Sequence, residues 1–147
     1  MPKQRVLILC TGNSARSQMA EGLLRWMAGD RFEVFSAGTK PSLVRAEAIA
    51  AMAELGVDIA THRSKSVDEF AGESFDYVIT VCDNARDACP IFPASTTQIH
   101  WSFEDPAATL DAFRATRDQI DRRLREFLRS GSPNDRQFPA TSVSRAL

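Results

Sequence analysis

The fold is decided by the stretch VLILCTGNSARS, which spans residues 6–17. Its first five residues are apolar and do not alternate with polar ones, a pattern typical of a strand buried on both faces of a parallel sheet. From Ser17 onward, apolar residues recur at intervals of three and four as far as Met27, and Gly29 stands where a helix would end. The stretch therefore predicts a buried strand, a short polar loop and an amphipathic helix.

The same alternation of strand and helix repeats along the rest of the chain. Hydrophobic patterns predict strands at residues 32–35, 77–81 and 97–101 and helices at residues 45–55 and 111–129. We therefore expect an α/β fold in a single domain: an open four-stranded parallel sheet with helices on both faces and right-handed crossovers. In such sheets the active site lies beyond the carboxyl ends of the strands.

The composition is that of an ordinary globular protein, with 147 residues, a formal net charge of −1, 44% hydrophobic residues and 25% charged residues. We expect the domain to span residues 1–129 and residues 130–147, which show no periodicity, to form a flexible C-terminal tail. The balanced charge gives no electrostatic footprint for nucleic acid or an anionic membrane. The apolar run at residues 6–10 is too short for a signal peptide or a membrane span, so we expect a cytoplasmic protein. We also expect it to be a monomer.

The loop at residues 10–17 contains the residue types of an oxyanion site. Cys10 and Arg16 stand near its two ends, and the loop leads directly into a helix. The backbone amides of such a loop can point at a tetrahedral anion while a guanidinium binds two of its oxygens. Gly12 and Asn13 tolerate the left-handed backbone that this requires, and the positive field is expected to lower the pKa of Cys10. The alternative is a buried, inert Cys10 with a solvent-exposed Arg16.

Three further candidates follow other predicted strands at the same edge of the sheet. Cys82 and Cys89 come after the third strand, and Asp105 comes after the fourth. Asp105 is a candidate general acid, because a departing oxygen must be protonated, and the following Pro106 stiffens its loop. The alternatives are a plain Asp-Pro turn and the neighbouring acid Glu104. The three cysteines of the chain are an odd number, which favours thiol chemistry over a disulfide framework.

Three motifs together resemble a known family: CTGNSARS at residues 10–17, VITVCDNARDACP at residues 78–90 and HWSFEDP at residues 100–106. With the order of strands and helices, they are similar to the low-molecular-weight protein tyrosine phosphatase fold family. Within that fold, the pair Cys82 and Cys89 is similar to that of the thioredoxin-coupled arsenate reductases. The resemblance covers about residues 5–129.

The resemblance implies a relay of thiols that reduces arsenate to arsenite. Cys10 attacks the arsenic, Cys82 attacks the Cys10 sulfur to form a disulfide and release arsenite, and Cys89 then attacks Cys82. Asp105 protonates the departing oxygen, and no cofactor is bound. The implied oxyanion-binding residues are Thr11, Gly12, Asn13, Ser14, Ala15, Arg16 and Ser17.

The resemblance also implies the partners. Thioredoxin supplies the electrons, which come ultimately from NADPH, although glutaredoxin or glutathione serves other arsenate reductases. Phosphate and sulfate are expected to compete with arsenate, because the loop recognises charge and tetrahedral shape. Ala107 stands where phosphatase relatives carry an aromatic residue, and this difference favours a small inorganic substrate.

The disulfide between the second and third cysteines has a geometric requirement. Residues 83–88 could continue from Cys82 as a helix, which would place Cys82 and Cys89 about 10.5 Å apart at 1.5 Å per residue. A disulfide needs Cα atoms roughly 4.4–6.8 Å apart. Formation of a Cys82–Cys89 disulfide would therefore unwind this segment or loop it out.

A possible remnant of a cation site involves residues from three separate parts of the chain. Asn13, Glu21 and Ser36 match positions that help to hold a monovalent cation in some relatives, but Lys65 stands where an acidic ligand is expected. We predict that the Lys65 ammonium takes the place of the ion. The alternative is a solvated surface lysine.

Two other functions remain open. The protein could be a phosphatase that hydrolyses phosphoesters through a Cys10 phosphocysteine, with Cys82 and Cys89 only protecting Cys10 from oxidation. It could instead be a non-catalytic sensor of arsenite or of redox state. For Cys82 alone, the alternative is a small residue of the hydrophobic core without a chemical role. A metal site is not expected, because a closed zinc site takes four ligands and only His62 and His100 could supply nitrogen.

Overall fold

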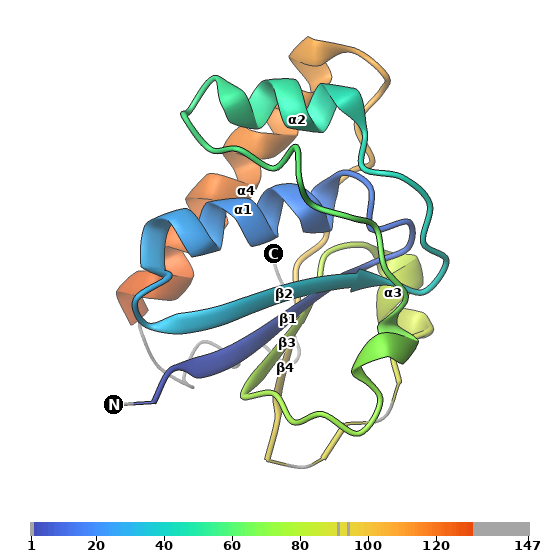
Figure 1. The fold of residues 1–147 in the computed structure, drawn as a ribbon, viewed down its shortest axis with the longest axis vertical. Coiled ribbons are helices and arrows are strands. Elements are labelled where there is room, and N and C mark those ends of the chain that lie inside the picture. Colours follow the sequence, from blue (N-terminus) through green and yellow to red (C-terminus); the bar gives the residue numbers. More distant parts are fainter. Residues whose placement is uncertain (1, 91, 94, 131–147) are drawn as a thin grey trace.

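The computed structural model describes residues 2–90, 92–93 and 95–130 (Figure 1). The strands are β1 (Gln4–Cys10), β2 (Phe32–Gly38), β3 (Tyr77–Thr80) and β4 (Thr97–His100). The helices are α1 (Arg16–Ala28), α2 (Ala46–Ala53), α3 (Asp83–Asp87) and α4 (Leu110–Ser130), with one 3-10 turn, η1 (Val67–Phe70). The predicted C-terminal tail lies outside the described residues apart from Ser130, which ends α4, so the domain boundary stays a prediction.

The four strands form one parallel sheet in the order β2-β1-β3-β4, which confirms the predicted architecture. β1 lies inside the sheet because residues 6–10 are apolar and buried on both faces. Full burial of each leucine or isoleucine there stabilises the fold by roughly 1.5–3 kcal/mol relative to exposure. Since all strands run in one direction, their carboxyl ends meet at one edge, where α3 also lies (Figure 1).

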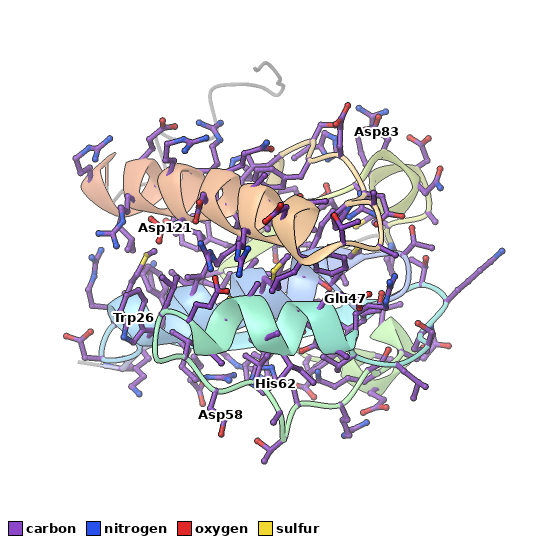
Figure 2. The ribbon with its side chains drawn as sticks, turned by 90° about the horizontal axis from the view of Figure 1, so that it is seen from above. Trp26, Glu47, Asp58, His62, Asp83 and Asp121 are labelled. Atoms are coloured by element: carbon purple, nitrogen blue, oxygen red, sulfur yellow. The ribbon has the colours of Figure 1, made fainter. Side chains whose placement is uncertain are left out.

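Helical elements cover both faces of the sheet, but unequally. The longer helices α1, α2 and α4 gather on one side (Figure 1), and the view from above shows α2 beside α4 (Figure 2). Phe32 of β2 faces this layer, with its ring centroid 5.9 Å from that of Phe127 in α4. Phe35 points to the opposite face, because side chains alternate along a strand. There its ring lies 5.6 Å from that of Phe70, so η1 covers this second face.

The boundaries of the elements differ from the prediction mainly at β2 and η1. β2 continues beyond the predicted end at residue 35 as far as Gly38, and its last residues pair with the end of β1. η1 was not predicted; its N-terminus is capped by Ser66, whose side chain accepts a hydrogen bond from the Asp68 amide. α3 forms in the segment that could continue from Cys82 as a helix. No helix in the described part of the chain is long and apolar enough to cross a membrane.

Candidate active site

The loop between β1 and α1 has its carbonyl groups bound by the segment that follows β2. Backbone amides within residues 39–45 donate hydrogen bonds of 2.8 to 3.2 Å to the carbonyls of Cys10, Thr11, Gly12 and Ser14. By contrast, no group among the described residues accepts a hydrogen bond from the backbone amides of residues 12–16. These amides, at the N-terminus of α1, are therefore available to bind an anion.

Asn13 fixes the shape of this loop. Its φ of 47° lies in the left-handed region, which asparagine tolerates, and its side chain is fully buried. Asn13 Nδ2 donates to Ser17 Oγ at 2.8 Å and to Ser36 Oγ at 2.9 Å, while Oδ1 accepts from the Lys65 amide at 3.0 Å. The left-handed backbone predicted for Gly12 is wrong, because Gly12 has no positive φ. One reversal, at Asn13, is enough to turn the chain.

Gly38, the last residue of β2, allows that strand to approach the loop closely. A Cβ atom added at Gly38 would lie 2.5 Å from the carbonyl oxygen of Thr11 and 2.9 Å from the amide nitrogen of Asn13. Both neighbours are backbone atoms, so only glycine fits without moving the loop. Sequence reasoning missed this residue, because the predicted strand ended before it.

Arg16 is held at the end of the loop and is not exposed to water. Its side chain is 13% exposed, and its Nη1 donates to the carbonyl of Phe103 at 2.9 Å. Its Nε is buried and has no hydrogen-bond partner among the described residues. An oxyanion bound to the loop amides would satisfy this buried donor, which is otherwise costly to leave unpaired. The burial rules out the solvent-exposed alternative for Arg16.

Asp105 is the carboxylate that contacts Arg16. Its Oδ1 lies 3.7 Å from Arg16 Nη2, and its side chain is 76% exposed. In the part of the chain that the structure describes, Glu104 makes no ion pair with Arg16. The geometry therefore favours Asp105 over Glu104 as the group that could transfer a proton to an anion held by Arg16.

The Cys10 and Cys82 thiols shift each other's pKa in opposite directions. Hydrogen bonding to Cys82, together with burial, raises the pKa of Cys10 far above its ordinary value. The same hydrogen bond, aided by the Thr11 hydroxyl 3.3 Å from Cys82 Sγ, lowers the pKa of Cys82 to about 5. The prediction of a lowered pKa at Cys10 is therefore wrong for this state of the protein. Two adjacent thiolates would repel each other, so the pair keeps one proton, and it stays on Cys10.

The other two cysteines flank α3. Cys82 directly precedes this helix, and the amide of Cys89 donates to the carbonyl of Arg86 at 3.4 Å. Cys89 is a free thiol packed partly into the core, and burial raises its pKa to about 11. A protonated thiol is a weak nucleophile. Burial thus favours the protonated form of Cys89, and α3 lies between Cys89 and Cys82 in the chain.

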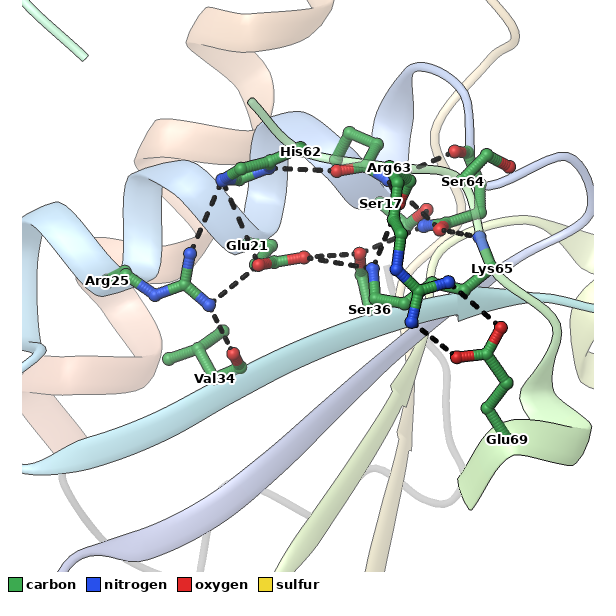
Figure 3. A network of polar contacts seen from close by, with 12 residues as sticks. Ser17, Glu21, Arg25, Val34, Ser36, His62, Arg63, Ser64, Lys65 and Glu69 are labelled. Carbon is green, nitrogen blue, oxygen red and sulfur yellow. Dashed lines mark hydrogen bonds and ion pairs between the residues drawn. The ribbon is translucent and has the colours of Figure 1, made fainter. Parts of the chain in front are cut away.

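A buried carboxylate network lies next to the loop (Figure 3). Glu21 is 5% exposed and accepts hydrogen bonds from Ser36 Oγ at 2.5 Å and from Arg25 Nη2 at 2.6 Å. Lys65 Nζ lies 3.9 Å from Glu21 Oε1, and the Lys65 side chain is 14% exposed. The structure thus brings Asn13, Glu21, Ser36 and Lys65 together, with the lysine inside the network. This burial argues against the solvated alternative for Lys65.

Two members of this network were missed by sequence reasoning. Arg25 binds Glu21 directly, and His62 Nε2 lies 3.9 Å from the same carboxylate. Arg25 could have been found from its spacing, because it stands four residues after Glu21 on one helix. His62 follows α2 and has no comparable signal. Among the described residues, no group of three or more His, Cys, Asp or Glu side chains could hold a metal ion.

The model of one protein family, described as low molecular weight phosphotyrosine protein phosphatase, matches residues 5–137. The chain belongs to this family. Its relatives include the arsenate reductase of Halalkalibacterium halodurans, which is 39% identical over 138 residues, or 89% of this chain and 99% of the relative. The arsenate reductase of Bacillus subtilis is 38% identical over 138 residues, with the same two coverages.

Solved structures similar to this chain include arsenate reductases and a protein tyrosine phosphatase. An arsenate reductase in an oxidized state is 32% identical, has a TM-score of 0.78, and the match covers 88% of this chain and 99% of that one. A thioredoxin-dependent arsenate reductase of Corynebacterium glutamicum is 32% identical and has a TM-score of 0.74, and the match covers 88% of this chain and 62% of that one. A low molecular weight protein tyrosine phosphatase from T. tengcongensis is 27% identical, with a TM-score of 0.74 and coverages of 87% and 99%.

Proposed function

We propose that this member of the phosphatase family is an arsenate reductase that takes its electrons from thioredoxin. The relatives named arsenate reductase support the reaction, and the neighbour named thioredoxin-dependent supports the donor. The observation that carries the proposal is the place of Cys82 beside the loop that holds Cys10, with the Cys82 Sγ 3.3 Å from the Thr11 hydroxyl. A phosphatase needs one thiol, whereas the reduction of arsenate needs a second thiolate at the sulfur of the first.

The first step forms a bond between sulfur and arsenic. Arsenate binds to the amides of residues 12–16, and the unpaired Arg16 Nε donates to one of its oxygens. The Cys10 sulfur attacks arsenic, and one arsenate oxygen leaves as water. The substrate is the hydrogen arsenate dianion, and the oxygen that leaves carries no proton at first. It takes one proton from the Cys10 thiol and one from Asp105, and the hydroxyl already on the arsenic stays there. The Cys82 thiolate is not consumed in this step.

The second step reduces the arsenic. The Cys82 thiolate attacks the Cys10 sulfur, and the bond between sulfur and arsenic breaks. The electron pair of that bond stays on arsenic, which leaves as arsenite in the trivalent state. The oxidation of two thiols to one Cys10–Cys82 disulfide supplies the two electrons that arsenic gains. The lowered pKa of Cys82 supports this role, because it keeps the attacking sulfur ionised at neutral pH.

The third step restores Cys10 by exchange. Cys89 gives its proton to water when the segment around α3 unwinds, and the resulting thiolate attacks the Cys82 sulfur. Cys10 leaves as a thiolate, which takes up a proton from water, and a Cys82–Cys89 disulfide remains. The dithiol of thioredoxin reduces this disulfide, with NADPH as the ultimate source of electrons. Competition by phosphate or sulfate, a cytoplasmic location and a monomeric state stay predictions. So does the replacement of a monovalent cation by Lys65.

The test is an assay of arsenate-dependent NADPH oxidation with thioredoxin and thioredoxin reductase. The wild-type protein should turn over repeatedly, and Cys10→Ser should not, because an alcohol is scarcely ionised and cannot be oxidised to a disulfide. Cys82→Ser should also lose arsenate reduction but keep a slow hydrolysis of an aryl phosphate, which needs Cys10 alone. Aryl phosphate hydrolysis by the wild type without arsenate reduction would identify a phosphatase. Arsenite binding without either reaction would identify a sensor.

A further inference from the structure

The carboxylate of Asp83 connects α3 to the ends of two strands. Asp83 is the first residue of α3, and its Oδ1 accepts hydrogen bonds from His100 Nε2 at 2.9 Å and from Ser102 Oγ at 3.2 Å. His100 ends β4, and its other ring nitrogen, Nδ1, lies 2.7 Å from the hydroxyl of Thr80 at the end of β3. In Figure 2, Asp83 lies at the surface, away from α2. One side chain therefore fastens the N-terminus of the helix to the sheet.

The hydrogen-bonding groups of this contact are matched. With Nε2–H donating to Asp83, a neutral His100 has Nδ1 free to accept the hydrogen of Thr80. The hydrogen bond from His100 also lowers the pKa of Asp83, which keeps its carboxylate ionised. The His100 side chain is 17% exposed and that of Asp83 is 61% exposed, so the histidine is held by the fold while the aspartate can move with the helix.

A Cys82–Cys89 disulfide is incompatible with this arrangement of α3. Cys82 precedes α3 and Cys89 follows its C-cap, Ala88. At the helical rise of 1.5 Å per residue, seven residues span about 10.5 Å, whereas a disulfide brings two Cα atoms within roughly 4.4–6.8 Å of each other. The helical hydrogen bonds from the Arg86 amide to the Cys82 carbonyl and from the Ala88 amide to the Asn84 carbonyl must change. Asp83 follows Cys82 directly, so its backbone moves in the same rearrangement. Its contacts with His100 and Ser102 therefore belong to the dithiol form.

We propose that Asp83 is a positioning residue which, by binding His100 and Ser102, holds α3 in its helical form and shifts the Cys82–Cys89 pair from disulfide towards dithiol. Contacts made in only one of two states displace the equilibrium towards that state. In the relay, the same contacts re-form when thioredoxin reduces the disulfide, so they favour reduction. Only the benefit to the relay rests on the proposed function. The equilibrium between the Cys82–Cys89 disulfide and its dithiol can be measured without arsenate.

The test uses the full chain with the substitution Cys10→Ser, which leaves Cys82 and Cys89 as the only thiols. The protein is equilibrated in mixtures of reduced and oxidised dithiothreitol, in which two protons and two electrons pass between the protein dithiol and the reagent disulfide. Alkylation and mass spectrometry then give the fraction oxidised. Asp83→Ala should shift the equilibrium constant about tenfold towards the disulfide, which is about 30 mV in reduction potential for a two-electron couple.

Controls separate the contact from the charge of the helix terminus. Asp87→Ala removes an acid of the same helix that contacts only its neighbour Arg86 among the described residues, and it should shift the equilibrium less than about twofold. Ser102→Ala removes one of the two donors and should give a smaller shift than Asp83→Ala in the same direction. His100→Gln should resemble Asp83→Ala, and adding Asp83→Ala to it should have little further effect.

Several outcomes would overturn the inference. An unchanged equilibrium in Asp83→Ala would mean that the contacts survive oxidation. An equal shift from Asp83→Ala in the presence and absence of His100→Gln would assign the effect to the helix dipole. A shift in Asp87→Ala as large as that in Asp83→Ala would make it a general effect of charge. If arsenate reduction fails while the tenfold shift is found, the proposed function falls and this inference stands.

Discussion

Cys10 and Cys82 influence each other's ionisation, and in the proposed relay this sets the order of attack. The pKa of Cys10 is raised by its hydrogen bond to Cys82, while that of Cys82 is lowered to about 5, so the resting thiolate lies on the sulfur that attacks second. The first attacker keeps its proton until an oxyanion is bound that can receive it. A protonated thiol is also slow to oxidise.

The ionisation of this pair can be measured directly. A group with a lowered pKa is ionised above that pKa, so the ultraviolet absorbance of one thiolate should appear as the pH rises through about 5. It should disappear again as the pH falls through the same value. Cys89→Ser should leave this titration unchanged, because the pKa of Cys89 is about 11. A reduced wild-type protein without a thiolate at pH 7 would contradict the account.

The identity of the general acid gives a second prediction at this scale. Asp105→Asn should lower the rate of arsenate reduction by about 10²–10⁴-fold at neutral pH, since the departing oxygen loses its proton donor. Glu104→Gln is the matched control, and its rate should stay within about twofold of the wild type. Both rates can be measured in single turnovers, before thioredoxin is needed. A larger loss in the Glu104 variant would transfer the role to that residue.

The residues of the site were predictable to different extents. Cys10 and Arg16 could be found because the loop, the strand before it and the helix after it are local in sequence. The pKa shifts of Cys10 and Cys82 could not be predicted, because they depend on how closely Cys10, at the end of β1, and Cys82, at the N-terminus of α3, approach each other. The unpaired state of Arg16 Nε could not be predicted either, because it depends on the hydrogen bond from Arg16 Nη1 to the Phe103 carbonyl, which is distant in sequence.

At the scale of elements, the site depends on how closely the end of β2 approaches the loop after β1. Gly38→Ala should push the loop outward, because the new Cβ would lie 2.5 Å from the Thr11 carbonyl oxygen. We expect a loss of about 1–3 kcal/mol in the free energy of unfolding, typical of overpacking, and weaker binding of phosphate by calorimetry. For stability, Gly12→Ala is the control, since its Cβ would meet the movable side chain of Ser14 at 3.2 Å. Equal effects of both substitutions would contradict this explanation.

The same elements show where hydrophobic patterns succeed. β1 was predictable because a short, continuous apolar run is typical of a strand buried on both faces. α4 was predictable because its apolar residues recur with a helical period over a long segment. The second half of β2 was not predictable, because Ser36, Ala37 and Gly38 are small residues with little preference for strands. Gly38 is required there because this end of β2 lies against the backbone of the loop after β1. η1 was missed because a single turn has no period to detect.

At the scale of the whole molecule, the proposed relay needs a sheet that stays in place and a short helix, α3, that can rearrange. β1 and the layer of α1, α2 and α4 bury the large apolar side chains, whereas α3 buries only Ala85 among its own residues. Little packing is therefore lost when α3 opens. The parallel sheet brings Cys10 and Cys82 to one edge. In the proposed relay, Cys89 acts only after the first disulfide has formed.

The relay is tested most directly by the product of one turnover in the variant Cys89→Ser, mixed with arsenate in the absence of any donor. The account predicts about one arsenite per protein molecule and a Cys10–Cys82 disulfide in the peptide map, because the second thiolate can act and the third cannot. Wild-type protein under the same conditions should stop at a Cys82–Cys89 disulfide. Release of arsenite with both Cys10 and Cys82 still reduced, or no arsenite at all, would contradict the account.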